Sequence, residues 1–210
     1  MRLSESAIDL PVFRLSRVLG FRLTKFDPVE SLQKQKWRLQ SHWLYLCVMP
    51  NLLQNLQIAK ATIVEKPAVA RMLQLYLHDF SEFAKVGEPY GEIGNDGTFQ
   101  YEHFDSYWNE AEREALLLRV NGHIAGFVLV NQWSASSLGT DNSMAEFFVL
   151  RKYRRSGIGK LVASKIIRQR SGKWEIPVAD YNQPALAFWR SVVSSLEHYS
   201  HEEIPGDGRR

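Results

Sequence analysis

A basic turn with two glycines, between positions 151 and 160, has the residue types that bind a polyphosphate. Positions 151 to 170 contain eight Lys or Arg and no Asp or Glu. Gly157 and Gly159 lack a Cβ, so the backbone can turn sharply and approach a ligand closely. The turn is not a P-loop, because G-x-x-x-x-G-K-[ST] is absent, and it lacks the third glycine of the dinucleotide fingerprint. It therefore predicts an anion site of another kind.

The turn joins two segments with different hydrophobic patterns. Residues 144–150 form a short apolar run rich in aromatic and branched residues, which is typical of a buried strand. From Lys160 onward the apolar residues recur at helical spacing, with Lys165, Arg168 and Arg170 on the other face. The first N–H groups of a helix have no partner inside it, and the helix dipole favours negative charge there. An anion is therefore expected at the start of this helix.

The turn sequence matches a known family motif. Arg154-Arg155-Ser156-Gly157-Ile158-Gly159 fits the [RQ]-x-x-G-x-[GA] turn of the GNAT superfamily of N-acetyltransferases, and its place between a strand and a helix fits as well. The chain thus resembles that family, in which the amides of this turn hold the pyrophosphate of acetyl-CoA, the acyl donor. The resemblance implies cofactor contacts by Arg154, Arg155, Ser156, Gly157, Ile158, Gly159 and Lys160. The alternative is a plain strand-to-helix turn whose basic residues are solvated.

A second stretch is similar to another motif of the family, N-x-x-A-x-x-x-[YF]. Asn182 and Ala185 match it, whereas the last position is Trp189. The resemblance implies that Asn182 contacts the pantetheine arm. Many members have a tyrosine near the cofactor sulfur that serves as general acid. Trp189 cannot give up a proton near neutral pH, so this role requires another group, water, or direct departure of the thiolate.

The resemblance implies direct acyl transfer from acetyl-CoA to a primary amine of a small molecule or a peptide, and this amine must first lose a proton. Glu146, on the strand beside the cofactor slot, is the first candidate for the base. An exposed or ion-paired strand residue is the alternative interpretation of Glu146. Tyr107 and Glu102 are weaker candidates. Amides near Phe148 and Val149 would stabilise the oxyanion of the tetrahedral intermediate.

Residues 79–114 form an acidic and aromatic segment, with ten Asp or Glu against Lys85 and Arg113. One interpretation is a cleft whose negative charge concentrates a cationic amine. The other is a solvated lid whose aromatic side chains pack on the core.

The remaining pattern predicts an α/β protein of the α+β type. Residues 58–64 alternate as a strand, a helix follows from Pro67, and Asn121-Gly122 between two apolar runs indicates a hairpin. A strand over 173–178 and a helix opened by Asn182 follow. The resemblance implies the GNAT fold, a mixed, mostly antiparallel central sheet flanked by helices. Its fourth and fifth strands are splayed and leave a slot for the pantetheine.

The predicted organisation is an N-terminal extension over 1–57, poorly ordered or accessory, an acyltransferase domain over 58–204 and a tail over 205–210. GNAT folds usually close with two more strands after the last helix, but the sequence has room for one, near 198–204. Either the domain is abbreviated, or a partner chain supplies a strand in a homodimer.

Several classes of protein are disfavoured by composition. One cysteine excludes an intramolecular disulfide, no apolar run approaches the roughly 18–20 residues that span a bilayer, and the N-terminus lacks a clean signal peptide. We therefore expect a cytoplasmic protein without a membrane span. The histidines show no metal spacing.

Two other functions stay open from the sequence. A non-catalytic acyl-CoA-binding regulatory module would bind acetyl-CoA without releasing thiol in the presence of amines. Nucleic-acid binding by the basic face of 151–170 would depend steeply on salt, and the acidic segment counts against it. We expect acetyl-CoA and an amine acceptor as partners, and no nucleic acid.

Overall fold

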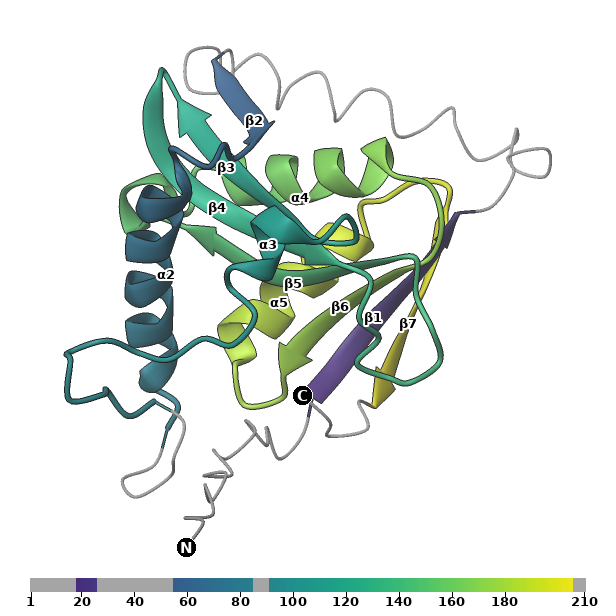
Figure 1. Cartoon of the computed structure of the whole chain (residues 1–210). Coiled ribbons are helices and arrows are strands. Elements are labelled where there is room, and N and C mark those ends of the chain that lie inside the picture. Colours follow the sequence, from purple (N-terminus) through teal and green to yellow (C-terminus); the bar gives the residue numbers. More distant parts are fainter. Residues whose placement is uncertain (1–17, 26–54, 85–90, 206–210) are drawn as a thin grey trace, which may run out of the picture.

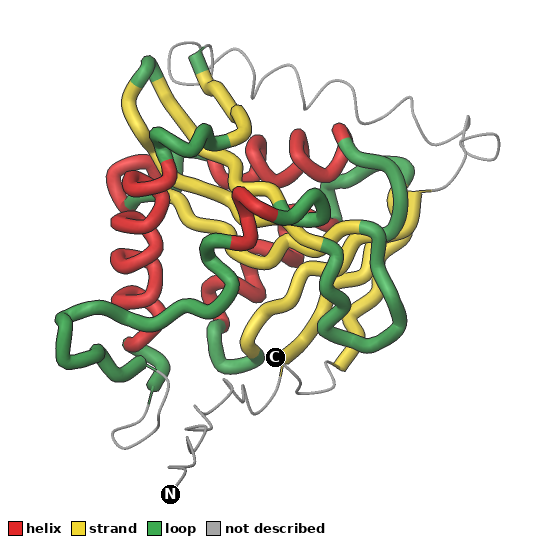
Figure 2. The backbone as a smooth tube through the Cα atoms, in the orientation of Figure 1, coloured by secondary structure: helices red, strands yellow, loops and turns green. Residues whose placement is uncertain are grey.

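The structure is a computed structural model that describes residues 18–25, 55–84 and 91–205. The strands within these ranges are β1 (Val18–Lys25), β2 (Leu56–Lys60), β3 (Glu114–Val120), β4 (His123–Asn131), β5 (Asn142–Val149), β6 (Trp174–Ala179) and β7 (Tyr199–Pro205). The helices are α2 (Lys66–Ser81), α3 (Ser106–Asn109), α4 (Ile158–Gln169) and α5 (Gln183–Val193), with a 3-10 turn η3 (Arg151–Tyr153). Figure 2 shows how the loops connect them.

All the described strands form one sheet in the order β2-β3-β4-β5-β6-β1-β7. Every neighbouring pair is antiparallel except β5 and β6, which are parallel. The sheet is therefore mixed and mostly antiparallel, as predicted.

Helices cover both faces of this sheet (Figure 1). The larger apolar cluster includes the buried side chains of α4 and α5, and the smaller one includes those of α2 together with Tyr107 of α3. No helix among the described residues is long and apolar enough to cross a membrane.

Local sequence signals account for several element boundaries. Asn121 and Gly122 have φ of 52° and 78°, the positive values that a type I′ turn needs, so the predicted hairpin of β3 and β4 is confirmed. Pro67 lies in the first turn of α2. Asn182 caps α5, because its Oδ1 accepts the N–H of Ala185 at 3.1 Å.

Strand β1 comes from the region that was expected to be an extension. It pairs with β6 on one side and β7 on the other, and Phe21 and Leu23 are fully buried. The prediction that residues 1–57 lie outside the domain is therefore wrong for residues 18–25. Leu19, Phe21 and Leu23 alternate with Gly20 and Arg22, which is a strand pattern, but its partners lie about 150 residues further along the chain.

The same strand completes the sheet after the last helix. Neither predicted alternative holds for the described sheet, because the second closing strand comes from the N-terminal part of the same chain. Residues 1–17, 26–54 and 206–210 lie outside the described ranges, and with them most of the rest of the predicted extension and nearly all of the tail. Residues 56 and 57, at the end of the predicted extension, belong to β2.

Candidate active site

The splay between β5 and β6 is where the candidate site forms. The two strands pair only at Asn142 with Trp174 and at Ser143 with Glu175, and then diverge. Pro177, two residues beyond the last pair, lines the resulting pocket, so its missing N–H interrupts no ladder with β5. The predicted splay between these two strands of the sheet is confirmed.

Strand β5 contains a bulge that sets the direction of its carboxylate. Leu129 of β4 pairs with Glu146, and the next residue, Val130, pairs with Met144, so Ala145 is the extra residue. Beyond the bulge, Glu146 shares a face with Phe148, which belongs to the cluster under α2. Glu146 is only 5% exposed. The predicted base therefore lies inside the fold.

A pocket of about 340 Å³ opens between the splayed strands, α2, α5 and the loop before α3. Its aromatic lining consists of Tyr76, Phe80, Tyr101, Tyr107, Trp133, Phe147 and Trp189. Its ionisable and amide side chains are Glu102, His103, Arg113, Asn131, Glu146 and Asn182. Both predicted catalytic residues, Glu146 and Tyr107, are thus in one pocket with Asn182, Ala185 and Trp189 of the second motif.

Glu146 is at the centre of a cluster of hydroxyl groups. The Tyr101 hydroxyl donates to Glu146 Oε1 at 3.0 Å, and Asn131 Nδ2 donates to the Tyr107 hydroxyl at 3.1 Å. Burial, and then the negative charge of Glu146, raise the pKa of Tyr107 above its usual value, outweighing hydrogen bonds from Asn131 and Tyr101. Tyr107 is therefore a neutral phenol near neutral pH, which can position a proton but not remove one.

Ser143 adds a polar group to the floor of this pocket. Its register partners are Asn131 on β4 and Glu175 on β6, so the three side chains share one face of the sheet. Ser143 is 1% exposed, and its Oγ has no hydrogen-bond partner among the described residues. A buried hydroxyl without a partner is costly, and a ligand in this pocket could supply one.

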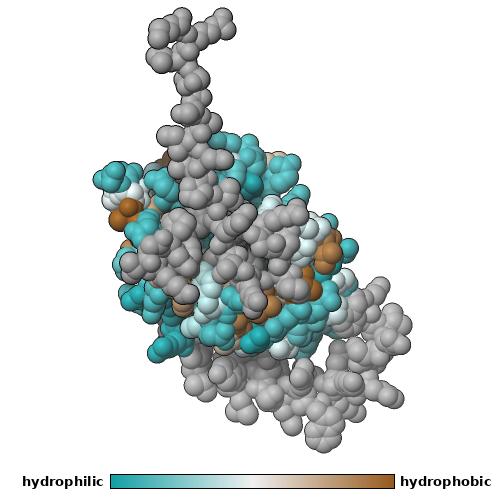
Figure 3. Space-filling model, turned by 90° about the horizontal axis from the view of Figure 1, so that it is seen from below, coloured by the Kyte–Doolittle hydropathy of each residue, from teal (hydrophilic) through white to brown (hydrophobic). Residues whose placement is uncertain are grey.

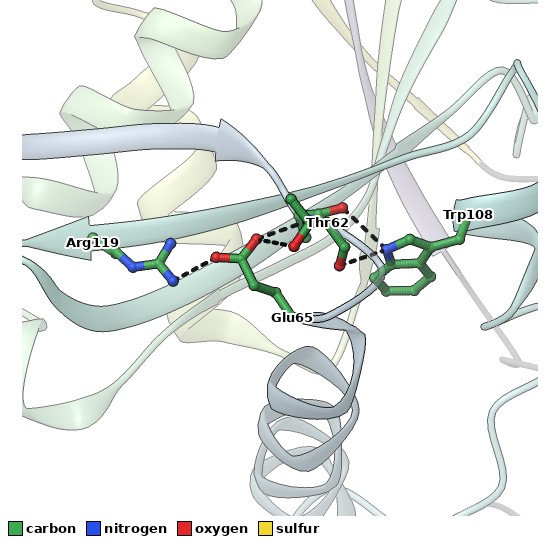
Figure 4. A network of polar contacts seen from close by, with 5 residues as sticks. Thr62, Glu65, Trp108 and Arg119 are labelled. Atoms are coloured by element: carbon green, nitrogen blue, oxygen red, sulfur yellow. Dashed lines mark hydrogen bonds and ion pairs between the residues drawn. The ribbon is translucent and has the colours of Figure 1, made fainter.

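Tyr107 is held by contacts of its neighbour Trp108 (Figure 4). The Trp108 Nε1 donates to the carbonyls of Ala61 at 3.1 Å and Thr62 at 3.3 Å. Glu65 accepts from the N–H and hydroxyl of Thr62, and from Arg119 on β3 at 2.6 Å. This network fixes the start of α2 to β3 and to the short helix α3, which presents Tyr107 to the pocket.

The basic turn, residues 151–160, follows β5, and none of its residues is among the described residues that line this pocket. Gly157 has φ of 81° and is the N-cap of α4. A Cβ on Gly159 would come within 3.3 Å of the Phe188 ring, so glycine here lets α4 pack closely on α5. The backbone conformation at Gly157 and the close packing at Gly159 explain both glycines.

The side chains of the turn are partly engaged by the protein. Arg154 Nε donates to the Val149 carbonyl at 2.7 Å, Ser156 Oγ to the Tyr153 carbonyl at 2.6 Å, and Lys160 Nζ to Ser191 at 3.2 Å. Arg155 is exposed and has φ of 61°. The groups that could bind an anion here are the main-chain N–H groups at the start of α4, with Arg155 beside them.

Asp79, near the end of α2, ties that helix to the turn. Arg151 and Arg154 each place a guanidinium nitrogen on its carboxylate, at 2.6 and 2.7 Å. Burial opposes ionisation of Asp79, but the hydrogen bonds from both arginines prevail and the pKa of Asp79 lies below its ordinary value. Sequence reasoning assigned Asp79 to the acidic segment and did not foresee this contact.

Trp189 closes the pocket on the side of α5. It is 5% exposed and packs edge-on against Phe147 at 5.3 Å and Phe188 at 5.0 Å between ring centroids. The residue at the usual tyrosine position is thus an apolar wall that has no hydroxyl for proton transfer.

The prediction that the acidic segment lines a cleft is only partly met. Among the described carboxylates of the acidic segment, only Glu102 lines the pocket. Four others form ion pairs with basic side chains: Asp79, Asp105, Glu110 and Glu114. Asp96 caps the N–H of Thr98 instead. Sequence reasoning missed Tyr101, Asn131 and Ser143, although the last two end the strands that flank a polar loop.

The structure thus has the features that the resemblance implied: a sheet with one splayed parallel pair, a glycine turn at the start of a helix, and a pocket between the splayed strands. The model of the acetyltransferase (GNAT) family matches residues 70–192, more than half of the chain. The chain belongs to this family, and the resemblance inferred from the turn is confirmed.

Several solved structures are similar to this chain at low sequence identity. A tetramutant protein from Bacillus halodurans is 18% identical, with a TM-score of 0.52, over 67% of this chain and 94% of that one. A protein of unknown function from Staphylococcus epidermidis is 15% identical, with a TM-score of 0.48. The match includes 90% of this chain but only 59% of the length of that protein.

A ribosomal-protein-alanine N-acetyltransferase from Brucella melitensis biovar Abortus 2308 is 17% identical, with a TM-score of 0.42, over 66% of this chain and 90% of that one. No curated protein matches the sequence.

Proposed function

We propose that this protein is an N-acetyltransferase that moves the acetyl group of acetyl-CoA directly to a primary amine. The observation that carries the proposal is the pocket in which Glu146, from the bulged part of β5, faces the space between β5 and β6. One pocket with a buried carboxylate and a slot between strands can hold an amine and a thioester together. Direct transfer needs both reactants in one place.

The acyl donor would lie along β5 and end at the turn. In a strand, successive N–H groups point to opposite edges. Leu150 N–H donates to the Ala125 carbonyl at 2.8 Å, on the side of β4, so Val149 N–H is directed to the edge where β6 has diverged. We assign the oxyanion contact to this amide, the pyrophosphate to Arg155 and the amides at the start of α4, and the pantetheine arm to Asn182.

Glu146 would act as the base in this reaction, directly or through water. It takes a proton from the ammonium, and the lone pair of the resulting neutral amine attacks the thioester carbonyl carbon. A C–N bond forms, the tetrahedral oxyanion collapses, and the C–S bond breaks with its electron pair on sulfur. The nitrogen then loses its remaining excess proton to the thiolate or to water, which leaves the neutral amide and the free thiol. A free thiol has a pKa of about 8.5, so the thiolate can leave without the general acid that Trp189 lacks.

The test is calorimetric titration of acetyl-CoA, followed by thiol release with amines. Wild type should bind with micromolar affinity, and Gly157→Trp should lose that binding because the indole blocks the turn. Gly122→Trp is the matched control, since Gly122 also has a positive φ (78°) and open space at its Cβ, but lies in the β3–β4 hairpin. Failure of wild type to bind would refute the proposal.

Thiol release separates the enzyme from a regulatory module that binds acetyl-CoA. Binding with no amine-dependent release across a broad amine screen would favour the module. The proposal that this protein is an N-acetyltransferase would then be wrong, even though the protein binds the acyl donor.

A further inference from the structure

The charges that line the pocket restrict the acceptor. Among the described lining residues there are two carboxylates, Glu146 and Glu102, and only Glu146 is buried. The lining also includes Arg113, whose Nε lies 2.6 Å from Glu110. An acceptor with several ammonium groups needs an anionic partner for each one that it buries. This pocket offers such a partner for one.

Three carboxylates outside the pocket lining do not change this balance, because each is paired with a basic side chain. Asp79 binds Arg151 and Arg154, Asp105 binds Lys66, and Glu114 binds Arg170. Their charges are compensated within the fold, so they add little attraction for a polycation.

The walls around Glu146 are mostly aromatic. Tyr76 and Phe80 come from α2, Tyr101 and Tyr107 from the segment around α3, and Trp133 from the loop after β4. Such faces favour a flat apolar group, and a single cation beside it. Figure 3 shows that the described surface that is visible from below is largely hydrophilic, with a few apolar spots.

Trp133 is the aromatic residue at the rim, and its loop is held in place. The residue is 38% exposed, and its main-chain N–H donates to Asn131 Oδ1 at 3.0 Å. The next part of the loop is tied to the buried carboxylate of Glu175, which accepts from Ser134 Oγ at 2.9 Å and Ser136 Oγ at 2.6 Å. Because the loop is already anchored, the Trp133 ring can contact a ligand without the entropic cost of ordering the loop on binding.

Ser143 gives independent reason to place a ligand here. Its hydroxyl is buried in the pocket floor and has no hydrogen-bond partner among the described residues. Deep in the same pocket lie Asn131 and the Tyr107 hydroxyl. A small acceptor with one polar substituent on an apolar body would give Ser143 a partner.

We infer that the acceptor is a small monoamine with an aromatic or similarly flat apolar body, and not a polyamine or an aminoglycoside. This inference rests on the proposed function and names the substrate class of that site. The amine meets Glu146, and the apolar body lies between Tyr101, Tyr107 and Trp133. The pocket of about 340 Å³ must also hold the end of the acyl donor, which limits the acceptor to a small molecule.

The experiment compares kcat/KM by thiol release for phenethylamine, tyramine, propylamine, spermidine and kanamycin. We expect the two aromatic monoamines to exceed spermidine and kanamycin at least tenfold. Trp133→Ala should raise the KM of phenethylamine about tenfold and leave that of propylamine and of acetyl-CoA unchanged. Leu138→Ala is the matched control, because Leu138 is an exposed apolar residue of the same loop outside the pocket lining.

A preference for spermidine or kanamycin would overturn the inference, as would equal effects of Trp133→Ala and Leu138→Ala. Absence of thiol release with both aromatic amines, while another amine of the series supports release, also overturns it. These outcomes differ from failure of the proposed function, which would appear as no binding of acetyl-CoA in calorimetry, or as binding without thiol release for any amine.

Discussion

At the scale of single residues, the site is a buried carboxylate surrounded by hydroxyl groups. Glu146 has the Tyr101 hydroxyl at 3.0 Å, and the phenol of Tyr107 is neutral because burial and Glu146 raise its pKa. Glu146 is thus the group in this cluster suited to accept a proton near neutral pH. The Tyr101 hydroxyl, which donates a hydrogen bond to this carboxylate, orients it.

Glu146→Gln is predicted to lower kcat for amine acetylation by about 10²–10⁴, the usual contribution of a general base. The amide keeps the size of the side chain and can still meet Tyr101, so the dissociation constant of acetyl-CoA should stay within about twofold. Initial rates of thiol release and calorimetry measure the two quantities. A kcat within about threefold of wild type would show that Glu146 is only a structural residue of β5.

At the scale of elements, the end of α2 and the turn before α4 are joined through Asp79. Two arginines hold its carboxylate, and Arg154 also caps the Val149 carbonyl at the end of β5. The helix that borders the acceptor side is thereby connected to the turn that would bind the acyl donor. The sheet supplies the slot, and this ion-pair cluster links α2 to the turn that follows β5.

Asp79→Asn is predicted to weaken acetyl-CoA binding several-fold and to lower the free energy of unfolding by about 1–3 kcal/mol near pH 7. Because the folded pKa of Asp79 is depressed, its contribution is present above the unfolded pKa, about 3.9. It is lost as pH falls through the folded pKa. The stability difference between wild type and variant should therefore shrink below about pH 4 in denaturant titrations.

Glu114→Gln is the control for this prediction. Glu114 pairs with Arg170 just past the other end of α4, so its loss should leave acetyl-CoA affinity unchanged. Equal weakening by both variants would mean that general stability, and not the turn, determines binding.

At the scale of the whole molecule, the sheet is closed by a strand from the N-terminal part of the chain. β1 lies between β6 and β7, and Phe21 points into the main apolar cluster. The strand that borders the slot, β6, is therefore supported on its far side by residues that precede the family match at 70–192.

Phe21→Ala is predicted to cost about 3–5 kcal/mol of unfolding free energy, because it removes a fully buried ring and leaves a cavity. Thr24→Ala, at an exposed position of the same strand, should change stability by less than about 0.5 kcal/mol. Urea denaturation followed by fluorescence measures both. A cost below about 1 kcal/mol for Phe21→Ala would contradict the assignment of β1 to the core.

The sequence alone was sufficient to identify the family and the order of most elements. The glycine turn, the Asn121-Gly122 hairpin and the Asn182 cap depend on local backbone geometry, and local geometry is encoded by neighbouring residues. Glu146 could be proposed as the base because its strand precedes the turn directly.

The tertiary structure decided which distant residues meet. It joined Tyr101 to Glu146, Asn131 to Tyr107 and Asp79 to Arg154, and it placed residues 18–25 in the middle of one half of the sheet. It also paired Asp79, Asp105, Glu110 and Glu114 of the acidic segment with basic side chains and left Glu102 as the segment's one described carboxylate in the pocket lining. Charge along the sequence therefore did not become charge in the pocket. Such contacts depend on strand order and on the direction of side chains, which spacing along the chain does not specify.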